Sequence, residues 1–342
     1  MIPLSSRFRL LLLCVAPCLG SALFAASATA LEIEPFATFN QSPIVQIYGL
    51  PAAGSPTVVP AGRIATELTL DIASNFAIDT ADHESITLDA EEWRTNVALR
   101  YGLGRDLEVG LDIPVLTQWG GILDAPIEGW HDFFGIEQGG RNSVPHGRTI
   151  LTYSRAGEQR INVTRENAGI GDIRLTGAWQ LYRDADDPRR AIALRSNLKF
   201  PTGDSSRLHG SGGVDFALWL SGREAIPLFP KSWAALWSAG GMLVSQGDIL
   251  PELQRNLAGF ASLGIGWQPG EAFNLKAFTN LNTPFYQHSA LRELSATSVQ
   301  LVAGGTIAIT RTTSLDISFS EDLPVLTTSP DFGYTFTLRT LW

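Results

Sequence analysis

The last twelve residues of the chain, from Asp331 to Trp342, constrain its fold more than any other segment. Large apolar side chains alternate there with small or polar ones, because Phe332, Tyr334, Phe336, Leu338 and Trp342 fall on one face and Gly333, Thr335, Thr337 and Arg339 on the other. Successive side chains of a β-strand point to opposite faces. An apolar face toward lipid and a polar face toward a lumen are what a transmembrane β-barrel requires. The segment therefore predicts a terminal membrane strand.

The same segment is similar to the carboxyl-terminal assembly signal of bacterial outer-membrane proteins. Gly333, Phe336, Leu338 and the terminal Trp342 stand at the positions of that signal. The resemblance implies that the barrel-assembly machinery is a partner during biogenesis. A soluble domain ending in so aromatic an edge strand would be prone to aggregation, which favours the barrel.

The amino-terminal residues 1–30 have the pattern of a secretory signal peptide. Arg7 and Arg9 precede an apolar stretch from Leu10 to Leu19, and Ala28-Thr-Ala30 provides small residues at a cleavage site. We therefore expect Sec-type export and a mature chain that begins at Leu31. The chain's two cysteines, Cys14 and Cys18, would be removed with the signal, which leaves no disulfide and no cysteine metal site.

The charge balance argues against a nucleic-acid partner. The chain has 25 basic and 34 acidic residues, and residues 1–30 contain two of the basic and none of the acidic ones. The mature charge is therefore 23 minus 34, or −11. An acidic surface repels nucleic acid. No apolar run after the signal is long enough for a membrane helix, which needs about 18 residues.

Periodicity of two extends through most of the mature chain and predicts an all-β, transmembrane, antiparallel, up-and-down barrel over residues 62–342. Short and long connections alternate between the strands, which is typical of single-chain outer-membrane barrels with both termini in the periplasm. About twelve strands are expected, and ten or fourteen remain open. The expected strands are 63–76, 93–103, 107–115, 172–182, 191–200, 214–222, 233–245, 257–267, 273–281, 298–309, 315–320 and 331–342.

The inward face of the first strands is rich in charged residues. Charges inside a barrel either pair across strands or line a wet channel, since an unpaired buried charge costs several kcal/mol. Both a structural ladder of ion pairs and a selectivity lining for a small solute fit the pattern. The candidate lumen-lining residues are Arg63, Glu67, Asp71, Arg94, Arg100, Asp112, Asp172, Arg174, Arg195 and Lys199.

Two segments do not follow the strand pattern. Residues 31–61 have apolar residues that need burial, and we expect either a periplasmic extension or a plug that enters the barrel, with Gln41 and Tyr48 as candidate contacts. The long extracellular loop 116–171 contains near-helical apolar spacing, which predicts a short amphipathic helix that caps the outer mouth or enters the lumen. Residues 149–153 and 160–164 are expected to pair as a hairpin. The candidate loop contacts are Trp130, His131, Asp132, Phe133 and Arg141.

These segments also carry a family resemblance. Asn40-Gln-Ser-Pro-Ile-Val-Gln-Ile-Tyr-Gly-Leu-Pro51 and Gly129-Trp-His-Asp-Phe-Phe-Gly135 resemble the DUF3187 family of uncharacterised proteobacterial outer-membrane proteins, over nearly the whole mature chain. Gly169-Ile-Gly-Asp-Ile-Arg-Leu175 and Leu198-Lys-Phe-Pro-Thr-Gly-Asp204 are similar to the MetA-pathway (phenol degradation) family of outer-membrane transporters. The second resemblance implies a barrel for small solutes, hydrophobic or aromatic ones among them.

No catalytic constellation stands out. His209-Gly-Ser211 places a base near a hydroxyl, and His131-Asp132 pairs a base with a carboxylate, but simpler structural roles are favoured for both. No cofactor and no metal site are expected. We therefore predict a channel or transporter for small solutes rather than an enzyme, surrounded by outer-membrane lipid and lipopolysaccharide. The alternatives are a lipid-modifying enzyme and a structural barrel without a through-path.

Overall fold

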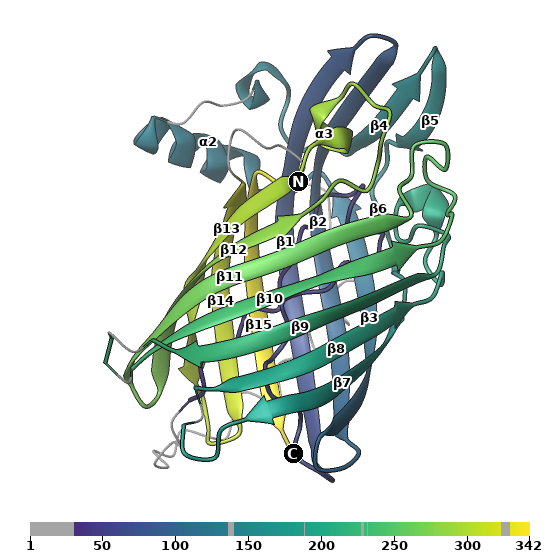
Figure 1. The fold of residues 1–342 in the computed structure, drawn as a ribbon. Helices are drawn as coiled ribbons and strands as arrows, with labels where there is room; N and C mark the ends of the chain where they lie inside the picture. The colour runs from purple at the N-terminus through teal and green to yellow at the C-terminus, as the bar shows by residue number, and fades with distance from the viewer. Residues whose placement is uncertain (1–30, 136–139, 188, 227–228, 231, 323–328) are drawn as a thin grey trace, which may run out of the picture.

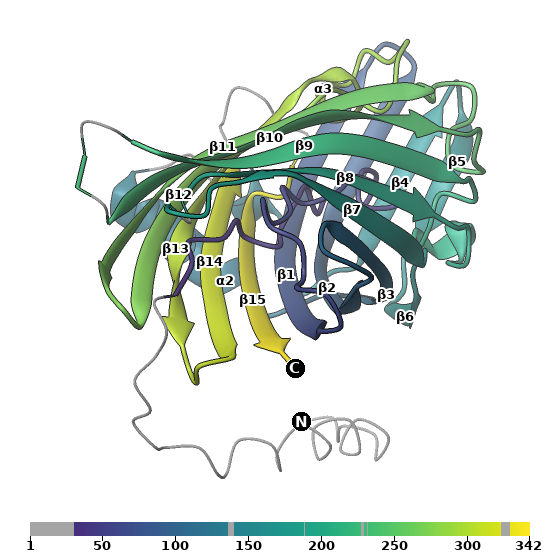
Figure 2. The same ribbon diagram turned by 60° about the horizontal axis from the view of Figure 1, so that its bottom comes forward.

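The computed structural model describes residues 31–135, 140–187, 189–226, 229–230, 232–322 and 329–342. In these residues, twelve antiparallel strands pair in sequence and the last pairs with the first, which closes a barrel (Figures 1 and 2). The barrel strands are β1 (Ile64–Ala81), β2 (Glu84–Gly102), β3 (Leu107–Trp119), β7 (Arg174–Arg183), β8 (Ala191–Lys199), β9 (Asp215–Ala225), β10 (Trp233–Val244), β11 (Leu257–Gly270), β12 (Phe273–Asn282), β13 (Ser298–Ala308), β14 (Thr313–Asp322) and β15 (Phe332–Leu341). The predicted signal peptide lies outside the described residues.

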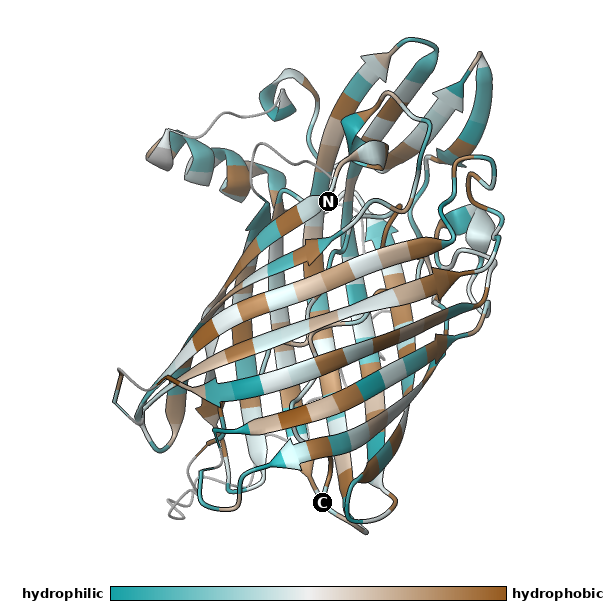
Figure 3. Ribbon diagram, viewed as in Figure 1, coloured by the Kyte–Doolittle hydropathy of each residue, from teal (hydrophilic) through white to brown (hydrophobic). Residues whose placement is uncertain are grey.

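The barrel turns its apolar face outward, as the sequence predicts. Leu68, Leu99 and Leu175 are 41%, 46% and 48% exposed, whereas Arg94 and Arg174 are each 5% exposed. Figure 3 shows hydrophobic and hydrophilic residues alternating along the strands. The predicted fold class, an all-β antiparallel up-and-down barrel, is confirmed. None of the helices in the described residues is long and apolar enough to span a membrane.

The carboxyl-terminal strand closes the barrel against β1. Their register runs from Ala65 opposite Leu341 to Ser74 opposite Phe332. The Trp342 indole donates a hydrogen bond to the Thr66 hydroxyl at 2.9 Å, and the Arg63 guanidinium donates to the Trp342 carbonyl. The proposed assembly-signal residues therefore lie on the closing strand, with Leu338 exposed on its outer face and Gly333 facing inward beside Ser320.

The strands β1 and β2 extend beyond the barrel, where the sequence analysis expected a loop over residues 77–92. They remain paired up to Ala81 and Glu84, on either side of a tight turn in which Asp82 has a φ of 49°. The upper part of β2 also pairs with β4 (Ile150–Arg155), which forms a hairpin with β5 (Glu158–Val163). This added sheet buries Ile86 and Leu88. The prediction of a loop over residues 77–92 is therefore wrong, whereas the prediction that residues 149–153 and 160–164 pair as a hairpin is confirmed.

The loop helix α2 (Asp124–Phe134) forms where predicted but lies outside the barrel wall (Figure 1). Its Trp130 ring lies 6.0 Å from that of Phe319 on β14 and 6.5 Å from that of Phe332 on β15, measured between centroids. Glu91, on the outer face of β2, accepts hydrogen bonds from the Ile122 and Leu123 backbone N–H groups at 3.0 Å each. The expectation that this helix caps the mouth or enters the lumen is therefore wrong.

The connections between barrel strands are short at one end of the barrel, as at 103–106 and 309–312, and we call this the short-turn end. The remaining loop elements gather at the opposite end, which we call the long-loop end. A short helix, η2 (Arg141–Ser143), follows α2, and Arg141 joins Asp124 to Asp331 through ion pairs of 2.6 and 2.7 Å. The strand β6 (Asn167–Ile170) adds to β3, so the irregular part of the predicted loop is shorter than expected. The other two elements are η3 (Ser205–Arg207) and α3 (Arg292–Ser295).

Residues 31–60 lie inside the barrel, where Figure 2 shows the purple segment running between the strands. The segment enters at the short-turn end, where the Leu31 N–H donates to the Glu271 carbonyl at 3.1 Å. It reaches the opposite end at Ile44, whose carbonyl accepts from the Tyr286 hydroxyl at 2.9 Å. It then returns, so that the Gly62 N–H donates to the Gly102 carbonyl at 2.8 Å. We call residues 31–60 the lumen segment.

Candidate functional site

The lumen segment is held by side chains of β7, β8 and β9 that donate hydrogen bonds to its backbone carbonyls. Arg174 donates to Tyr48 and Leu50 at 3.2 Å each, Asn197 donates to Gly49 at 3.0 Å, and Trp219 donates to Ala53 at 2.9 Å. We call this stripe the donor ladder. Its members are Arg174, Gln180, Arg195, Asn197, Lys199, Trp219 and Ser221, whose acceptors lie between Ile47 and Thr57.

An apolar core surrounds the turn of the lumen segment at the long-loop end. Tyr48 is fully buried and stacks on Phe285, with ring centroids 4.6 Å apart and an interplanar angle of 5°. The sheet formed by the upper part of β2 with β4 and β5, and the loops after β10 and β12, supply the remaining side chains. They include Ile86, Leu88, Leu151, Tyr153, Leu253, Tyr286, Leu291 and Leu294. This core closes that end of the lumen in the structure.

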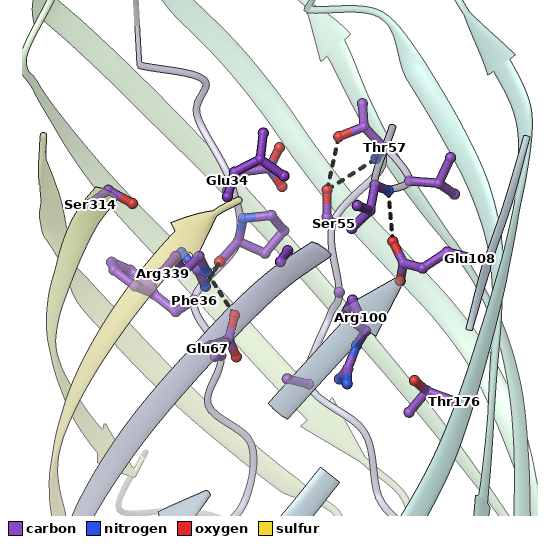
Figure 4. A pocket seen from close by; sticks show the side chains of 18 of the residues that line it. Glu34, Phe36, Ser55, Thr57, Glu67, Arg100, Glu108, Thr176, Ser314 and Arg339 are labelled. Carbon is purple, nitrogen blue, oxygen red and sulfur yellow. Dashed lines mark hydrogen bonds and ion pairs between the residues drawn. The ribbon is translucent and has the colours of Figure 1, made fainter. Parts of the chain in front are cut away.

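A cavity of about 580 Å³ remains near the short-turn end, between the lumen segment and the wall (Figure 4). This volume is in the range of small-molecule sites, which is about 300–1,000 Å³. Arg100, Glu108 and Thr176 line it from β2, β3 and β7, and Ser55 and Thr57 line it from the lumen segment. Thr310 and Thr312, in the β13–β14 turn, place it close to the short-turn end.

The carboxylates that line this cavity are each paired with an arginine. Glu67 lies 2.8 Å from Arg339, Asp112 lies 2.5 Å from Arg100, and Glu108 lies 3.2 Å from Arg195. Figure 4 shows Arg339 beside Glu67 on the wall. Glu34, on the lumen segment, lies 3.2 Å from Arg223. Such pairing offsets the cost of removing these charges from water.

The ten predicted lumen-lining residues fall into three groups. Glu67, Arg94, Arg100, Asp112, Arg174 and Arg195 line the cavity. Asp71, Asp172 and Lys199 are buried in the wall, where Asp172 pairs with Lys199 at 2.6 Å. Arg63 is at the rim beside the carboxyl terminus. The structure therefore brings most of these residues together around the lumen segment.

Sequence reasoning missed the role of Phe39. Its ring contacts two arginines, because the Arg94 and Arg174 guanidinium carbons are 5.0 and 5.2 Å from the ring centroid. Favourable cation–π contacts have such distances. Arg94 also pairs with Asp71 at 3.6 Å, whereas Arg174 has no carboxylate within salt-bridge distance among the described residues. A single phenylalanine in an irregular segment carries no pattern that would have indicated this contact.

The other predicted contacts are distributed over different surfaces. Gln41 belongs to the lumen segment and donates to the Phe39 carbonyl at 3.3 Å. Trp130, His131, Asp132 and Phe133 lie on α2, outside the barrel, and Phe133 is 80% exposed. These four residues therefore do not face the lumen, which corrects their assignment as contacts at the mouth.

The candidate catalytic pairs have other contacts in the structure. His209 Nε2 lies 2.5 Å from Asn167 Oδ1, while the Ser211 hydroxyl accepts a hydrogen bond from Lys199 Nζ at 2.5 Å. Burial lowers the pKa of His209. His131 is buried against the outside of the barrel. Among the described residues, no group of three or more His, Cys, Asp or Glu side chains is arranged to hold a metal ion.

Three solved structures are similar to this chain, and the first of them supports the fold. The COG4313 outer membrane channel from Pseudomonas putida F1 is 14% identical, with a TM-score of 0.54, and the match covers 84% of this chain and 97% of that one. The CymD monoaromatic hydrocarbon channel is 12% identical, with a TM-score of 0.37, over 93% and 97% of the two chains. The NanC porin is 6% identical, with a TM-score of 0.41, over 81% and 98%.

No curated protein matches the sequence. A family model matches residues 10–342, which is nearly the whole chain. The family resemblance noted from the sequence is thereby confirmed. The chain belongs to the family described as "Protein of unknown function (DUF3187)".

Proposed function

We propose that this protein is a channel or transporter for small solutes, hydrophobic or aromatic ones among them. The observation that carries the proposal is the cavity of about 580 Å³ inside a closed barrel with an apolar exterior. The cavity combines ion pairs with the rings of Phe36, Phe39 and Trp219, and such a mixed lining suits amphipathic molecules. The barrel from Pseudomonas putida F1 that shares this fold is called an outer membrane channel.

In this proposal the structure represents a closed state. The lumen segment, which acts as the plug, occupies the barrel between the cavity and the long-loop end, where the apolar core surrounds Tyr48. A solute can pass only if this segment shifts. Such a shift is feasible because the hydrogen bonds from the donor ladder to the carbonyls of the lumen segment can be exchanged for bonds to water or solute at modest net cost.

We further propose the setting in which the channel works. Sec-type export and signal cleavage precede insertion into the bacterial outer membrane by the barrel-assembly machinery, which reads Gly333, Phe336, Leu338 and Trp342. Lipid and lipopolysaccharide surround the exposed apolar belt. The short-turn end, which holds both Leu31 and Trp342, faces the periplasm.

Reconstitution of the full mature chain tests the channel. We expect rare openings in planar bilayers from the unaltered protein and more frequent openings from Tyr48→Ala, because this substitution removes the stacked ring that anchors the lumen segment at Phe285. The control is Tyr182→Ala, since Tyr182 is exposed at the opposite end of β7. Absence of conductance and of solute uptake in both the unaltered protein and Tyr48→Ala would remove the proposed function.

A further inference from the structure

The lumen cavity borders the donor ladder. Some charged side chains around them have a partner of opposite charge within salt-bridge distance, and others do not. Arg174, Arg195, Asn197 and Trp219 belong to the ladder and also line the cavity. A molecule in the cavity is therefore next to side chains that currently donate to the lumen segment. What it can bind depends on which of these groups have a partner of opposite charge.

The acidic groups of the cavity are already neutralised. Glu67, Glu108 and Asp112 each have an arginine within 3.2 Å. A cationic solute would have to compete with these arginines for every carboxylate. The cavity therefore disfavours cations, even though it contains several acids.

Arg174 is the exception among the buried arginines of the cavity. It is 5% exposed and has no carboxylate within salt-bridge distance in the described part of the chain. Its Nη atoms donate to the neutral carbonyls of Leu50 and Tyr48 at 3.2 Å, and its Nε atom has no hydrogen-bond partner. A buried guanidinium with only neutral acceptors is incompletely compensated.

Neighbouring groups increase the preference for an anion. Arg94 also contacts the Phe39 ring, and its contact with Asp71 is long at 3.6 Å. The strands β7, β8 and β9 carry four inward cations, Arg174, Arg195, Lys199 and Arg223, but only one inward carboxylate of described residues, Asp215, with Asp172 directly before β7. Arg195, Lys199 and Arg223 each have a carboxylate within 3.2 Å, so in the described part of these strands Arg174 is the inward cation that lacks one.

We propose that the donor ladder is a binding site for a small organic carboxylate, and that the backbone carbonyls of the lumen segment occupy the acceptor positions when no solute is bound. The inference rests on the proposed channel function and names its substrate class. A carboxylate accepts two parallel hydrogen bonds from a guanidinium, and such charge-assisted bonds are about twice as strong as those to a neutral carbonyl. The carboxylate therefore displaces Tyr48 and Leu50 from Arg174.

Displacement of these carbonyls couples binding to opening. Tyr48 contributes both a carbonyl bound to Arg174 and the ring stacked on Phe285. A solute that accepts the hydrogen bonds of Arg174 in place of these carbonyls weakens the attachment of the lumen segment beside the apolar core. The rings of Phe39 and Trp219 offer contacts to the apolar part of an aromatic acid.

Isothermal titration of the full mature chain with benzoate, toluene and benzylammonium tests the class of ligand. These probes share a ring and differ in charge. We expect saturable binding of benzoate and binding at least about tenfold weaker for the other two, because a hydrogen bond between charged groups contributes roughly that factor. Equal affinity for toluene or benzylammonium, or no benzoate binding, would overturn the proposal.

Variants of Arg174 test its location. Arg174→Gln should weaken benzoate binding about tenfold or more, and Arg174→Lys should weaken it less, because lysine retains the charge but not the planar fork. Arg190→Gln, in the exposed β7–β8 turn, is the control for loss of one positive charge and should bind like the unaltered protein. Heat-modifiable migration in gels verifies that each barrel is closed. Unchanged benzoate affinity in a closed Arg174→Gln barrel would place the anion elsewhere.

Conductance measured on the same preparations separates this inference from the channel function. Benzoate should increase the open time of the unaltered protein in planar bilayers and have no such effect on Arg174→Gln. A protein that conducts but does not bind benzoate retains the channel function and loses the carboxylate site. A protein that binds benzoate through Arg174 but never conducts retains the site and loses the channel function.

Discussion

Gly102 illustrates how a single residue fixes the path of the lumen segment. It ends β2, and a Cβ atom at this position would overlap the carbonyl oxygens of Val59 and Pro60, where the lumen segment leaves the barrel. Backbone atoms cannot move aside as the end of a flexible side chain can. Only a residue without a side chain allows this close approach.

Replacement of Gly102 should therefore destabilise the barrel. We expect Gly102→Ala to lower the unfolding free energy by about 1–3 kcal/mol, the usual range for forced overpacking. Gly104→Ala is a matched control two residues away, because nothing lies within 4 Å of a Cβ atom there. Urea titrations of both variants in detergent provide the comparison. Equal stability of the two variants would contradict the steric account.

His209 gives the fold a defined response to acid. Burial lowers its pKa in the folded loop between β8 and β9, while the nearby Asp204 raises it by a smaller amount. As the pH falls, the unfolded chain takes up the proton first, near its ordinary pKa of about 6.5. The stability contributed by neutral His209 is therefore complete above about pH 6.5 and decreases as the pH falls below it.

The measurement is the change in melting temperature between pH 7.5 and pH 5. We expect the unaltered protein to lose more stability over this interval than His209→Gln, whose side chain stays neutral and can still reach Asn167. NMR titration of the imidazole should give a pKa below 6.5. An imidazole that titrates above 6.5 would show that the folded loop favours the charged form instead.

For single side chains, the sequence indicated which face of the strand each one lies on, but not which residues it contacts. The two-residue period placed Arg94, Arg100 and Arg174 inside correctly, because one strand fixes the faces of all its residues. It could not indicate that Arg100 pairs with Asp112 while Arg174 donates its hydrogen bonds to carbonyls. Partners on other strands and on the lumen segment depend on register and on an irregular chain path, neither of which a single strand encodes.

Among the elements, the helix α2 shows the limit of periodic patterns. Its apolar spacing correctly predicted an amphipathic helix. The spacing could not indicate which apolar surroundings the helix contacts. A helix at the mouth of a barrel can meet the lumen core or the lipid outside. The contacts of Trp130 with Phe319 and Phe332 place it on the outer wall.

The position of α2 predicts contact with lipid. An environment-sensitive fluorophore attached at Phe133→Cys should emit at shorter wavelength in liposomes than one at Asp132→Cys. Phe133 is 80% exposed on a helix outside the barrel wall, and exposed aromatic rings of such helices enter the membrane interface. A chain that begins at Leu31 has no other cysteine, so labelling is specific. Identical emission from both positions would show that α2 does not lie at the membrane interface.

The strands and the lumen segment differ in how far the sequence determined them. All twelve barrel strands were predicted near their observed positions, because each must alternate between lipid and lumen. The upper halves of β1 and β2 were not, since they extend beyond the barrel, where β2 pairs with β4 and the strands no longer alternate between lipid and lumen. The path of residues 31–60 has no repeat, and many of its backbone carbonyls accept hydrogen bonds from side chains of the wall.

For the whole molecule, the charges and the apolar surfaces define one architecture. An apolar belt faces outward, paired charges and a donor ladder face inward, and the lumen segment fills much of the space between them. Closure of β15 on β1 gives each barrel strand a partner on both sides. The proposed transport follows only if this arrangement exists in a membrane.

A nitroxide scan along β11 in proteoliposomes tests this arrangement most directly. Spin labels placed singly from Leu257 to Trp267 report their exposure to oxygen, which concentrates in lipid. The account predicts a period of two, with high oxygen accessibility at Leu257, Leu263 and Ile265 and low accessibility at Ala258, Phe260 and Ser262. A profile without this period, or with its maxima at the second set of positions, would contradict a barrel that faces lipid with its apolar side.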